Sequence, residues 1–358
     1  MDISTLRILE VGDAPLFKRA FPANTLAIWT GGNQADESSP GWRNFTLGRW
    51  SEIRRAVRSG PFDLIVCQPP LYAPWDPRSL ARALFGRRTL AGHSPLIRGL
   101  GTTLVRGRLA APLVVLDRDD LPVINRHGIR LLDRCRAYFK RELPTDRWRV
   151  FMKTAHANLP TPRFRASPRF AARIGRLHPI SLGLRHDRVA HLVRDERPKS
   201  SDVFFAGISD ANSTVRARGI AQLRRLADAG LRIDIPDRML PLPEFFERCA
   251  RAWLCWSPEG LGWDCFRHYE AAACGSVPLI SQPAIERHRP LLDGVHALYY
   301  DIEGDGLERA VRAALADTDR LRTIATAGRA HVLTHHTEAS LCRYVAETAL
   351  AAGPAQAS

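Results

Sequence analysis

The stretch from Trp253 to Ile280 reads WLCWSPEGLGWDCFRHYEAAACGSVPLI and carries the clearest structural pattern in the chain. A short apolar run is followed by a loop with two glycines, a helix of small residues and a second apolar run. A strand, a loop, a helix and another strand predict a unit of parallel sheet. Ligands of such sheets bind at the carboxyl ends of the strands, so we expect the loop SPEGLGWD at a ligand-binding edge.

This loop and the start of the helix combine features that suit a nucleotide. Gly260 and Gly262 let the backbone approach a ligand closely, and the N–H groups that begin the helix attract phosphate. Arg267 can add a charged contact to the same anion. Glu270 shares the helix face of Arg267, where its carboxylate can accept hydrogen bonds from two ribose hydroxyls. Spacing alone also permits an ordinary strand, loop and helix with an Arg–Glu pair facing solvent.

Length and composition indicate a soluble two-domain protein. The chain has 358 residues, more than one compact core usually holds. No apolar run reaches the roughly 20 residues that span a bilayer, and the first residues do not resemble a secretory signal, so we expect a cytoplasmic location. The seven cysteines are scattered without a C-x-x-C pair, which favours buried free thiols over disulfides or zinc ligands.

The net charge of +15 raises the question of a nucleic-acid partner. Of the 52 basic residues, 48 are arginines, a skew that codon usage in a GC-rich genome produces. The arginines are dispersed, without a polybasic tail, a zinc finger or an RNA-binding aromatic signature. We therefore expect no nucleic-acid partner, and the charge equally suits donor phosphates or an anionic membrane surface.

Two α/β patterns follow each other along the chain. In the first half, strand-like and helical runs alternate over Leu6–Val11, Thr25–Gly32, Trp50–Gly60, Phe62–Pro70, Ala111–Asp120 and Arg130–Leu143. A charged segment, Arg194–Ser201, suits a linker. The alternation restarts at Asp202–Gly207 and continues to a last helix expected over Thr337–Ala352. These patterns predict an α/β protein with two Rossmann-like halves rather than one barrel.

With these motifs together, Ala250–Ile280 resembles the donor-binding signature of GT-B glycosyltransferases. In that family a strand, an acidic Gly loop, a helix with a glutamate and a short strand follow in this order. Upstream, Asp202–Gly207 and Ser213–Gly219 resemble the strand and the basic loop that reaches the donor phosphates. The resemblance covers about Arg176 to Tyr344. The N-terminal half matches in architecture only, as acceptor domains do.

The resemblance implies two Rossmann-like domains facing each other across a cleft. Residues 1–180 would form the acceptor-binding domain, and residues 181–335 would bind a nucleotide sugar. Residues 336–358 would form a helix that returns to the N-terminal domain and a flexible tail.

The resemblance also implies a set of donor-binding residues: Gly207, Arg216, Arg218, Glu259, Gly260, Gly262, Arg267 and Glu270. The arginines among them would stabilise the departing diphosphate, so that neither a metal nor another cofactor is required. One departure concerns Glu259. Many retaining members place two glutamates eight positions apart, but Glu259 and Glu270 are 11 apart, which leaves the role of Glu259 and the anomeric stereochemistry open.

An inverting mechanism needs a carboxylate or histidine in the N-terminal half to deprotonate the acceptor hydroxyl. Asp13 and Asp119 each follow a strand-like run and are the candidates for this catalytic base, with His93 as a third. Asp13 could instead cap a helix. Asp117 and Asp119 form an Asp-x-Asp pair of the kind that binds a metal in the other large glycosyltransferase fold, but the two-halved pattern argues against that fold.

Two charged clusters have simpler interpretations. Lys140 and Arg141 indicate a solvated strand end more than a contact to donor or acceptor phosphates. His335 and His336 indicate a helix C-terminal cap more than a metal pair.

These expectations describe a hexosyltransferase-like enzyme that moves a sugar from a nucleoside-diphosphate sugar to a glycan, polysaccharide or lipid-linked acceptor of the cell envelope. A basic surface would suit peripheral contact with the anionic inner face of the membrane. Two alternatives stay open, namely a nucleotide-sugar epimerase or hydrolase of the same fold and a basic nucleic-acid-binding protein.

Overall fold

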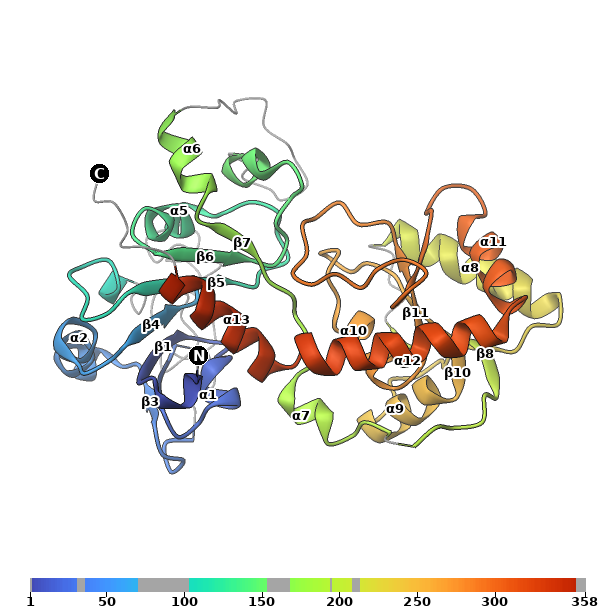
Figure 1. The fold of residues 1–358 in the computed structure, drawn as a ribbon, viewed down its shortest axis with the longest axis horizontal. Helices are drawn as coiled ribbons and strands as arrows, with labels where there is room; N and C mark the ends of the chain where they lie inside the picture. Colours follow the sequence, from blue (N-terminus) through green and yellow to red (C-terminus); the bar gives the residue numbers. More distant parts are fainter. Residues whose placement is uncertain are drawn as a thin grey trace, which may run out of the picture. The chain divides into compact units, whose positions relative to one another are not determined.

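The computed structural model describes residues 2–30, 36–69, 103–152, 168–193, 195–207 and 213–351. The chain divides into two compact units (Figure 1). Unit 1 comprises residues 1–180 together with 338–358, and unit 2 comprises residues 181–337. His93 and the tail after Ala351, about which the sequence made predictions, lie outside the described residues.

Unit 1 is built on a parallel sheet with the strand order β3-β2-β1-β4-β5-β6-β7. The strands are β1 (Ile8–Gly12), β2 (Thr25–Trp29), β3 (Trp42–Asn44), β4 (Leu64–Cys67), β5 (Leu113–Asp117), β6 (Ala137–Lys140) and β7 (Leu177–Pro179). The helices are α1 (Phe17–Ala20), α2 (Trp50–Ser59), α5 (Arg126–Leu132), α6 (Pro168–Ile174) and α13 (Glu338–Ala351), with short 3-10 turns at Ile3–Thr5, Leu47–Arg49 and Arg147–Phe151.

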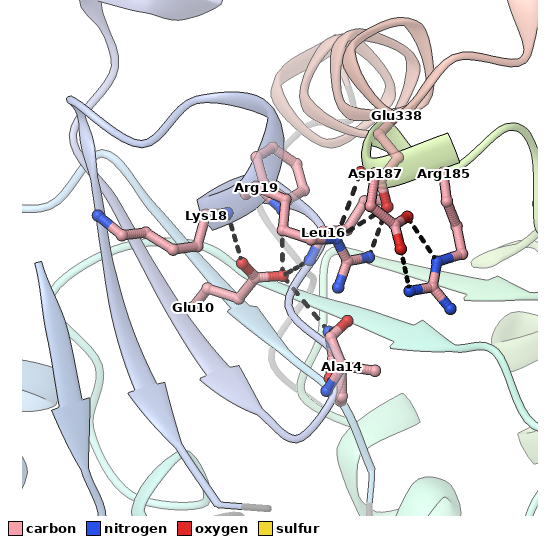
Figure 2. A network of polar contacts seen from close by, with 10 residues as sticks. Glu10, Ala14, Leu16, Lys18, Arg19, Arg185, Asp187 and Glu338 are labelled. Atoms are coloured by element: carbon pink, nitrogen blue, oxygen red, sulfur yellow. Dashed lines mark hydrogen bonds and ion pairs between the residues drawn. The ribbon is translucent and has the colours of Figure 1, made fainter. Parts of the chain in front are cut away.

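Both faces of this sheet are covered, which is why its central strands are buried and mostly apolar, with the buried Glu10 of β1 as an exception. Every residue of β1, β4 and β5 is buried. Leu9 belongs to the core beneath α2 and α5, whereas its neighbour Ile8 belongs to the core beneath α1 and α13. The last helix therefore packs on unit 1 although it follows unit 2 in sequence, and Arg19 of α1 holds its first residue, Glu338, through an ion pair of 2.5 Å (Figure 2).

Unit 2 is built on a second parallel sheet with the strand order β12-β11-β10-β8-β9. The strands are β8 (Ser201–Phe204), β9 (Ile233–Asp234), β10 (Ala252–Ser257), β11 (Val277–Ser281) and β12 (Leu298–Tyr300). The helices are α7 (His186–Val189), α8 (Thr214–Asp228), α9 (Leu242–Ala250), α10 (Phe266–Ala273), α11 (Gly306–Leu315) and α12 (Thr318–His335). Strand β10 is central, so the loop that follows it leaves the middle of the carboxyl edge.

The structure differs from the sequence-based predictions in two local elements. The segment Ser213–Gly219 was expected to be a basic loop, but it is the start of α8, with Ser213 as the N-cap that accepts a hydrogen bond from the backbone N–H of Arg216. The short edge strands β3 and β7 were not predicted, since three residues are too few to establish an alternating pattern.

Candidate functional site

The glycine loop after β10 is fixed by buried polar side chains. His268 in α10 hydrogen-bonds Ser257 Oγ at 2.7 Å and the backbone oxygen of Trp263 at 3.0 Å, so it ties the loop's two ends to the helix. Asp264 accepts hydrogen bonds from the backbone N–H of Leu182 and the hydroxyl of Tyr269, both at 2.6 Å. The helix α10 therefore begins at a defined place on the carboxyl edge of the sheet.

A cavity of about 590 Å³ opens beside the start of α10. Its walls come from the ends of β8 and β9, the start of α9, the start of α10 and the short helix α7: Arg188, Ala206, Gly207, Pro236, Asp237, Arg238, Met239, Leu240, Leu242, Phe245, Cys265, Phe266, Arg267 and Glu270. Within the described part of the chain, the N-cap residue Cys265 gives the first turn of α10 no side-chain hydrogen bond. The cavity thus meets a helix N-terminus that can receive an anion.

Arg267 lies in the wall of this cavity and is only partly used by the protein. Its Nη2 donates to the backbone oxygen of Ala206 at 2.7 Å, and its guanidinium lies over the ring of Phe205, 5.0 Å from the ring centre. Its Nε and Nη1 are buried and have no hydrogen-bond partner among the described residues. Two buried donors without acceptors are costly, and a bound anion would satisfy them.

Gly207 is required by the position of Arg267. A side-chain carbon at Gly207 would lie 2.7 Å from Arg267 Nη2 and 3.1 Å from the ring of Phe205. The glycine therefore makes room for the guanidinium rather than supplying a flexible turn.

Glu270 lies one helical turn after Arg267 and is buried, with 3% of its surface exposed. Arg188 of α7 donates to Glu270 Oε1 at 2.7 Å. Burial raises the pKa of Glu270, and the charges of Arg188 and Arg267 oppose this rise. Arg188 Nε is also buried and has no hydrogen-bond partner in the described ranges. The alternative that spacing also permitted, an Arg–Glu pair on a solvated face, does not hold, because Glu270 is buried and pairs with Arg188.

The sequence did not identify Arg188. It lies near the start of unit 2, outside the motifs that the sequence pattern identified, and one arginine among 48 carries no signal of its own. Only the folded position of α7 places it at the cavity.

The other expected donor residues separate into two groups. Arg216 is near the glycine loop, where its Nε donates to the backbone oxygen of Glu259 at 3.1 Å. Burial raises the pKa of Glu259, and the charge of Arg216 opposes the rise. Gly260 donates its backbone N–H to the oxygen of Gly262 at 3.0 Å, so this N–H is engaged within the loop.

Arg218 does not join this group. Residues two positions apart on a helix point to different sides, and Arg218 pairs with Glu303 at 3.8 Å while its side chain is 53% exposed. Neither Arg216 nor Arg218 lines the cavity that contains Arg267, but Arg216 contacts the glycine loop beside it.

In unit 1, the carboxylate that holds the start of α1 is Glu10 rather than Asp13. Glu10 accepts hydrogen bonds from the backbone N–H groups of Leu16 at 2.7 Å and Lys18 at 2.9 Å (Figure 2). Burial raises the pKa of Glu10, and these backbone hydrogen bonds oppose the rise. Gln68, after β4, fastens the same loop through Ala14. Asp13 is half-buried in the loop that Glu10 and Gln68 fix.

Asp119 follows β5 at the same edge of the unit 1 sheet, and β4 lies between β1 and β5. Its neighbour Asp117 is held by Lys140 Nζ at 2.9 Å and the hydroxyl of Tyr138 at 2.6 Å. Burial, followed by the charge of Asp117, raises the pKa of Asp119. A carboxyl with a raised pKa at a ligand edge suits proton transfer.

The expectation of a solvated strand end at Lys140 and Arg141 is wrong. Lys140 is fully buried and Arg141 is 6% exposed, because each is paired with an acid of the β5 loop, Asp117 and Asp120 respectively. The pairs hold the loop that carries Asp119.

Over the described residues, no three His, Cys, Asp or Glu side chains are arranged to hold a metal ion. His336 follows α12 and is buried, with Ser181 Oγ 2.9 Å from its Nδ1 and the backbone oxygen of Arg289 2.8 Å from its Nε2. All seven cysteines are free. No helix in the described part of the chain is both long and apolar enough to cross a bilayer.

The fold defines the class of protein before any particular relative is considered: two Rossmann-like α/β units, each on a parallel sheet, with the last helix packed on the first unit. Residues 254–347 match the family model described as glycosyl transferase-like. The resemblance to GT-B glycosyltransferases is therefore confirmed, and the chain has the GT-B fold.

Solved structures of this fold match nearly the whole chain. They include sucrose-phosphate synthase from Thermosynechococcus elongatus, with 14% identity, a TM-score of 0.52 and coverage of 97% of this chain and 99% of that one. HepE from Anabaena in complex with UDP has 14% identity, a TM-score of 0.56 and coverage of 97% and 100%. An alpha-glucosyltransferase in complex with UDP has 9% identity, a TM-score of 0.54 and coverage of 97% and 100%. None of the curated proteins matches this sequence.

Proposed function

We propose that the protein is a glycosyltransferase that binds a nucleoside-diphosphate sugar in the unit 2 cavity and transfers its sugar to an acceptor hydroxyl. The observation that carries the proposal is the set of three buried guanidinium N–H groups without hydrogen-bond partners among the described residues, on Arg188 and Arg267, beside the buried carboxylate of Glu270. Buried N–H donors without acceptors on two cations would be satisfied by an anion, and the carboxylate beside them suits the hydroxyls of a ribose.

The remainder of the cavity suits the other parts of such a donor. Pro236, Met239 and Leu240 supply an apolar wall, and Met239 is 87% exposed, so a flat base could cover it. A volume of about 590 Å³ lies in the range of roughly 300–1,000 Å³ that small-molecule sites occupy. Two proteins of this fold were solved with UDP, and HepE was also solved with UDP-glucose, which supports a nucleotide sugar as the ligand.

The chemical roles follow from these positions. As the bond between the sugar and the diphosphate breaks, negative charge develops on the diphosphate, where Arg267, Arg216 and the start of α10 would stabilise it. This arrangement supplies the positive charge that a metal ion would otherwise supply. The acceptor oxygen forms the new bond and loses its proton to a carboxylate of unit 1, for which Asp13 and Asp119 are the candidates; we test Asp119, whose pKa burial raises.

The finer assignments made from the sequence belong to this proposal. We infer a hexosyl donor, a glycan or lipid-linked acceptor of the cell envelope, and a cytoplasmic protein that can contact the anionic membrane surface. An alpha-glucosyltransferase of the same fold was solved with UDP and a 13-mer DNA, so DNA belongs among the acceptors to be tested despite the dispersed arginines.

The test is release of nucleoside diphosphate from a panel of nucleotide sugars, with and without candidate acceptors. A transferase releases nucleotide much faster when its acceptor is present, and Asp119→Asn slows this release without weakening donor binding. Release that no acceptor accelerates, at the same rate in Asp119→Asn, would favour the hydrolase or epimerase instead. Arg267→Gln should weaken donor binding, and Arg218→Gln is its matched control, because Arg218 lies outside the cavity and the two substitutions change the net charge equally.

A further inference from the structure

A second cavity in unit 2, of about 520 Å³, opens at the opposite edge of the sheet. It is lined by the residues that precede the strands, namely Lys199 before β8, Ala250 before β10 and Gly275 before β11. Helix α12 forms its other wall through Leu321, Arg322, Ala325, Thr326, Arg329, Ala330 and Leu333. Strand β10 has six residues, so about 20 Å of strand separates this cavity from the proposed donor site.

The charge in this cavity is strongly one-sided. Four cations line it, Arg197, Lys199, Arg322 and Arg329, against the single acid Glu196, which is exposed. Lys199 is half-buried, and its Nζ donates to two backbone oxygens, those of Ala250 at 2.9 Å and Gly275 at 2.8 Å. Burial lowers the pKa of Lys199; the charge of Glu196 opposes this shift, and the charge of Arg322 adds to it by less.

The acids that pair with Arg197 and Arg322 are exposed or shared, so they neutralise these two cations only in part. Arg322 pairs with Asp319 at 2.9 Å, but the Asp319 side chain is 90% exposed, so solvent screens this ion pair. Glu247 is shared by Arg197 and Arg251. An anion inside the cavity would therefore gain from several cations at once and would relieve their mutual repulsion.

The walls also suit an organic body attached to that anion. The ring of Trp253 lies between two of the cations, with Lys199 Nζ 5.9 Å and Arg322 Cζ 5.2 Å from its centre. Leu321, Ala325 and Leu333 of α12 add apolar surface. Small side chains at Ala250, Gly275 and Ala330 leave the space open.

We propose that this cavity is a second ligand site, separate from the donor site, that binds a small phosphomonoester through Lys199, Arg322 and Arg329. A phosphomonoester carries nearly two negative charges at neutral pH, which matches a site with several cations better than a singly charged carboxylate does. The phosphate can belong to a free metabolite or to the head group of a lipid, because both present the same chemistry to the cavity.

The experiment measures binding of glycerol 3-phosphate to the full chain by calorimetry, beside vesicles that contain phosphatidic acid. Arg322→Glu reverses one wall charge at an exposed position, and we expect it to weaken binding about tenfold or more, the loss typical of a charged hydrogen bond. Ala330→Phe fills the cavity without changing its charge and should weaken binding as well. Arg218→Glu gives the same change in net charge outside both cavities and should leave binding unchanged.

The outcomes separate this proposal from that of the donor site. Binding of free glycerol 3-phosphate that survives Glu270→Gln but is lost in Arg322→Glu supports the second site and a metabolite ligand. Binding to vesicles alone, lost in the same variant, supports the second site and a lipid source. No binding in either form, or binding that Arg267→Gln abolishes and Arg322→Glu leaves intact, would overturn the proposal even if the donor site binds nucleotide normally.

Discussion

At the scale of single residues, the site depends on how few partners the protein gives to its own arginines. Nη2 of Arg267 donates a hydrogen bond to Ala206, whereas its Nε and Nη1 have no hydrogen-bond partner among the described residues. Nη1 of Arg188 donates to Glu270, and its Nε likewise has no hydrogen-bond partner among those residues. Elsewhere in unit 2, arginines such as Arg248 are bonded to two acids. The difference marks the cavity as a place prepared for a ligand.

Replacing Gly207 with alanine tests this preparation directly. The new methyl group would lie 2.7 Å from Arg267 Nη2, so the guanidinium must move away from Ala206. We expect nucleotide affinity to fall about tenfold, as for loss of one charged hydrogen bond, with little change in the free energy of unfolding. Calorimetric titration and urea unfolding measure the two effects. Gly48→Ala is the control, because a methyl group there meets no atom within 4 Å; equal nucleotide affinity in both variants would contradict the prediction.

Replacing Arg188 with glutamine tests how Glu270 is held. Burial already raises the pKa of Glu270, and removing the Arg188 charge removes the largest opposing influence, so this pKa should rise further. Ribose hydroxyls need the ionised carboxylate as acceptor, so nucleotide binding should weaken as the pH falls and Glu270 becomes protonated. The midpoint of this loss should lie at a higher pH in the variant than in the parent. Binding measured from pH 8 to pH 5 gives the two midpoints, and Arg188→Lys should restore part of the difference. Identical midpoints would show that Arg188 does not act on Glu270.

At the scale of elements, the donor edge is built by close packing behind it. Ala271, Ala272 and Ala273 of α10 are fully buried against the sheet. Gly219 of α8 lies directly against the ring of Trp256, whose Nε1 donates to the hydroxyl of Tyr300 at 3.0 Å. Trp256 in turn contacts Phe205, the ring beneath Arg267. A chain of packed side chains thus connects α8 to Arg267 at the ligand site.

Gly219→Ala should therefore have the opposite sign from the usual effect in a helix. Alanine normally stabilises a helix interior relative to glycine by about 0.5–1 kcal/mol. Here the added carbon would overlap the Trp256 ring, and overpacking of this kind costs about 1–3 kcal/mol. Urea unfolding should show a net loss of stability, and any gain would mean that the ring relaxes freely.

The loop after β11 is held to the end of α12 by histidines that are neutral in the folded state. Burial lowers the pKa of His336 to about 3 and that of His288 to about 4. The unfolded chain takes up these protons near pH 6.5, so stability is complete above that pH and is lost as the pH falls toward the folded-state values. For His336 alone the expected slope is about 1.4 kcal/mol per pH unit.

Unfolding midpoints in urea between pH 7.5 and pH 5 measure this slope. His336→Asn removes the titrating group, so its stability should depend less steeply on pH even if the variant is less stable throughout. A slope equal to that of the parent protein would show that His336 is not the group that titrates.

At the scale of the whole molecule, the two-part α/β architecture could be predicted because strands buried on both faces give long apolar runs, such as those of β4, β5 and β10. The strand order could not, since β4 in unit 1 and β10 in unit 2 become central through pairings between segments far apart in sequence. Arg267 and Glu270 could be predicted because both lie on one turn of α10. Arg188 could not, because it meets Glu270 only through the fold across 82 positions.

The positions of charged side chains also depend on contacts between segments far apart in sequence. The sequence indicated that Lys140 and Arg141 face solvent, whereas both are buried by pairing with acids that precede them by about 20 positions. Arg216 and Arg218 were both expected at the donor phosphates because their segment resembles the basic loop of the family, but on α8 the two side chains point to different sides. Charged residues gain a role from tertiary partners, which a sequence pattern does not contain.

The central claim is that unit 2 binds the nucleotide part of a sugar donor through Glu270. Calorimetric titration of UDP, GDP, dTDP and ADP in EDTA, against the parent chain, Glu270→Gln and the control Arg218→Gln, tests it most directly. We expect one nucleotide to bind the parent and Arg218→Gln equally and to bind Glu270→Gln about tenfold or more weakly. If no nucleotide binds, or if one binds Glu270→Gln as tightly as the parent, the claim that unit 2 binds the donor through Glu270 is wrong.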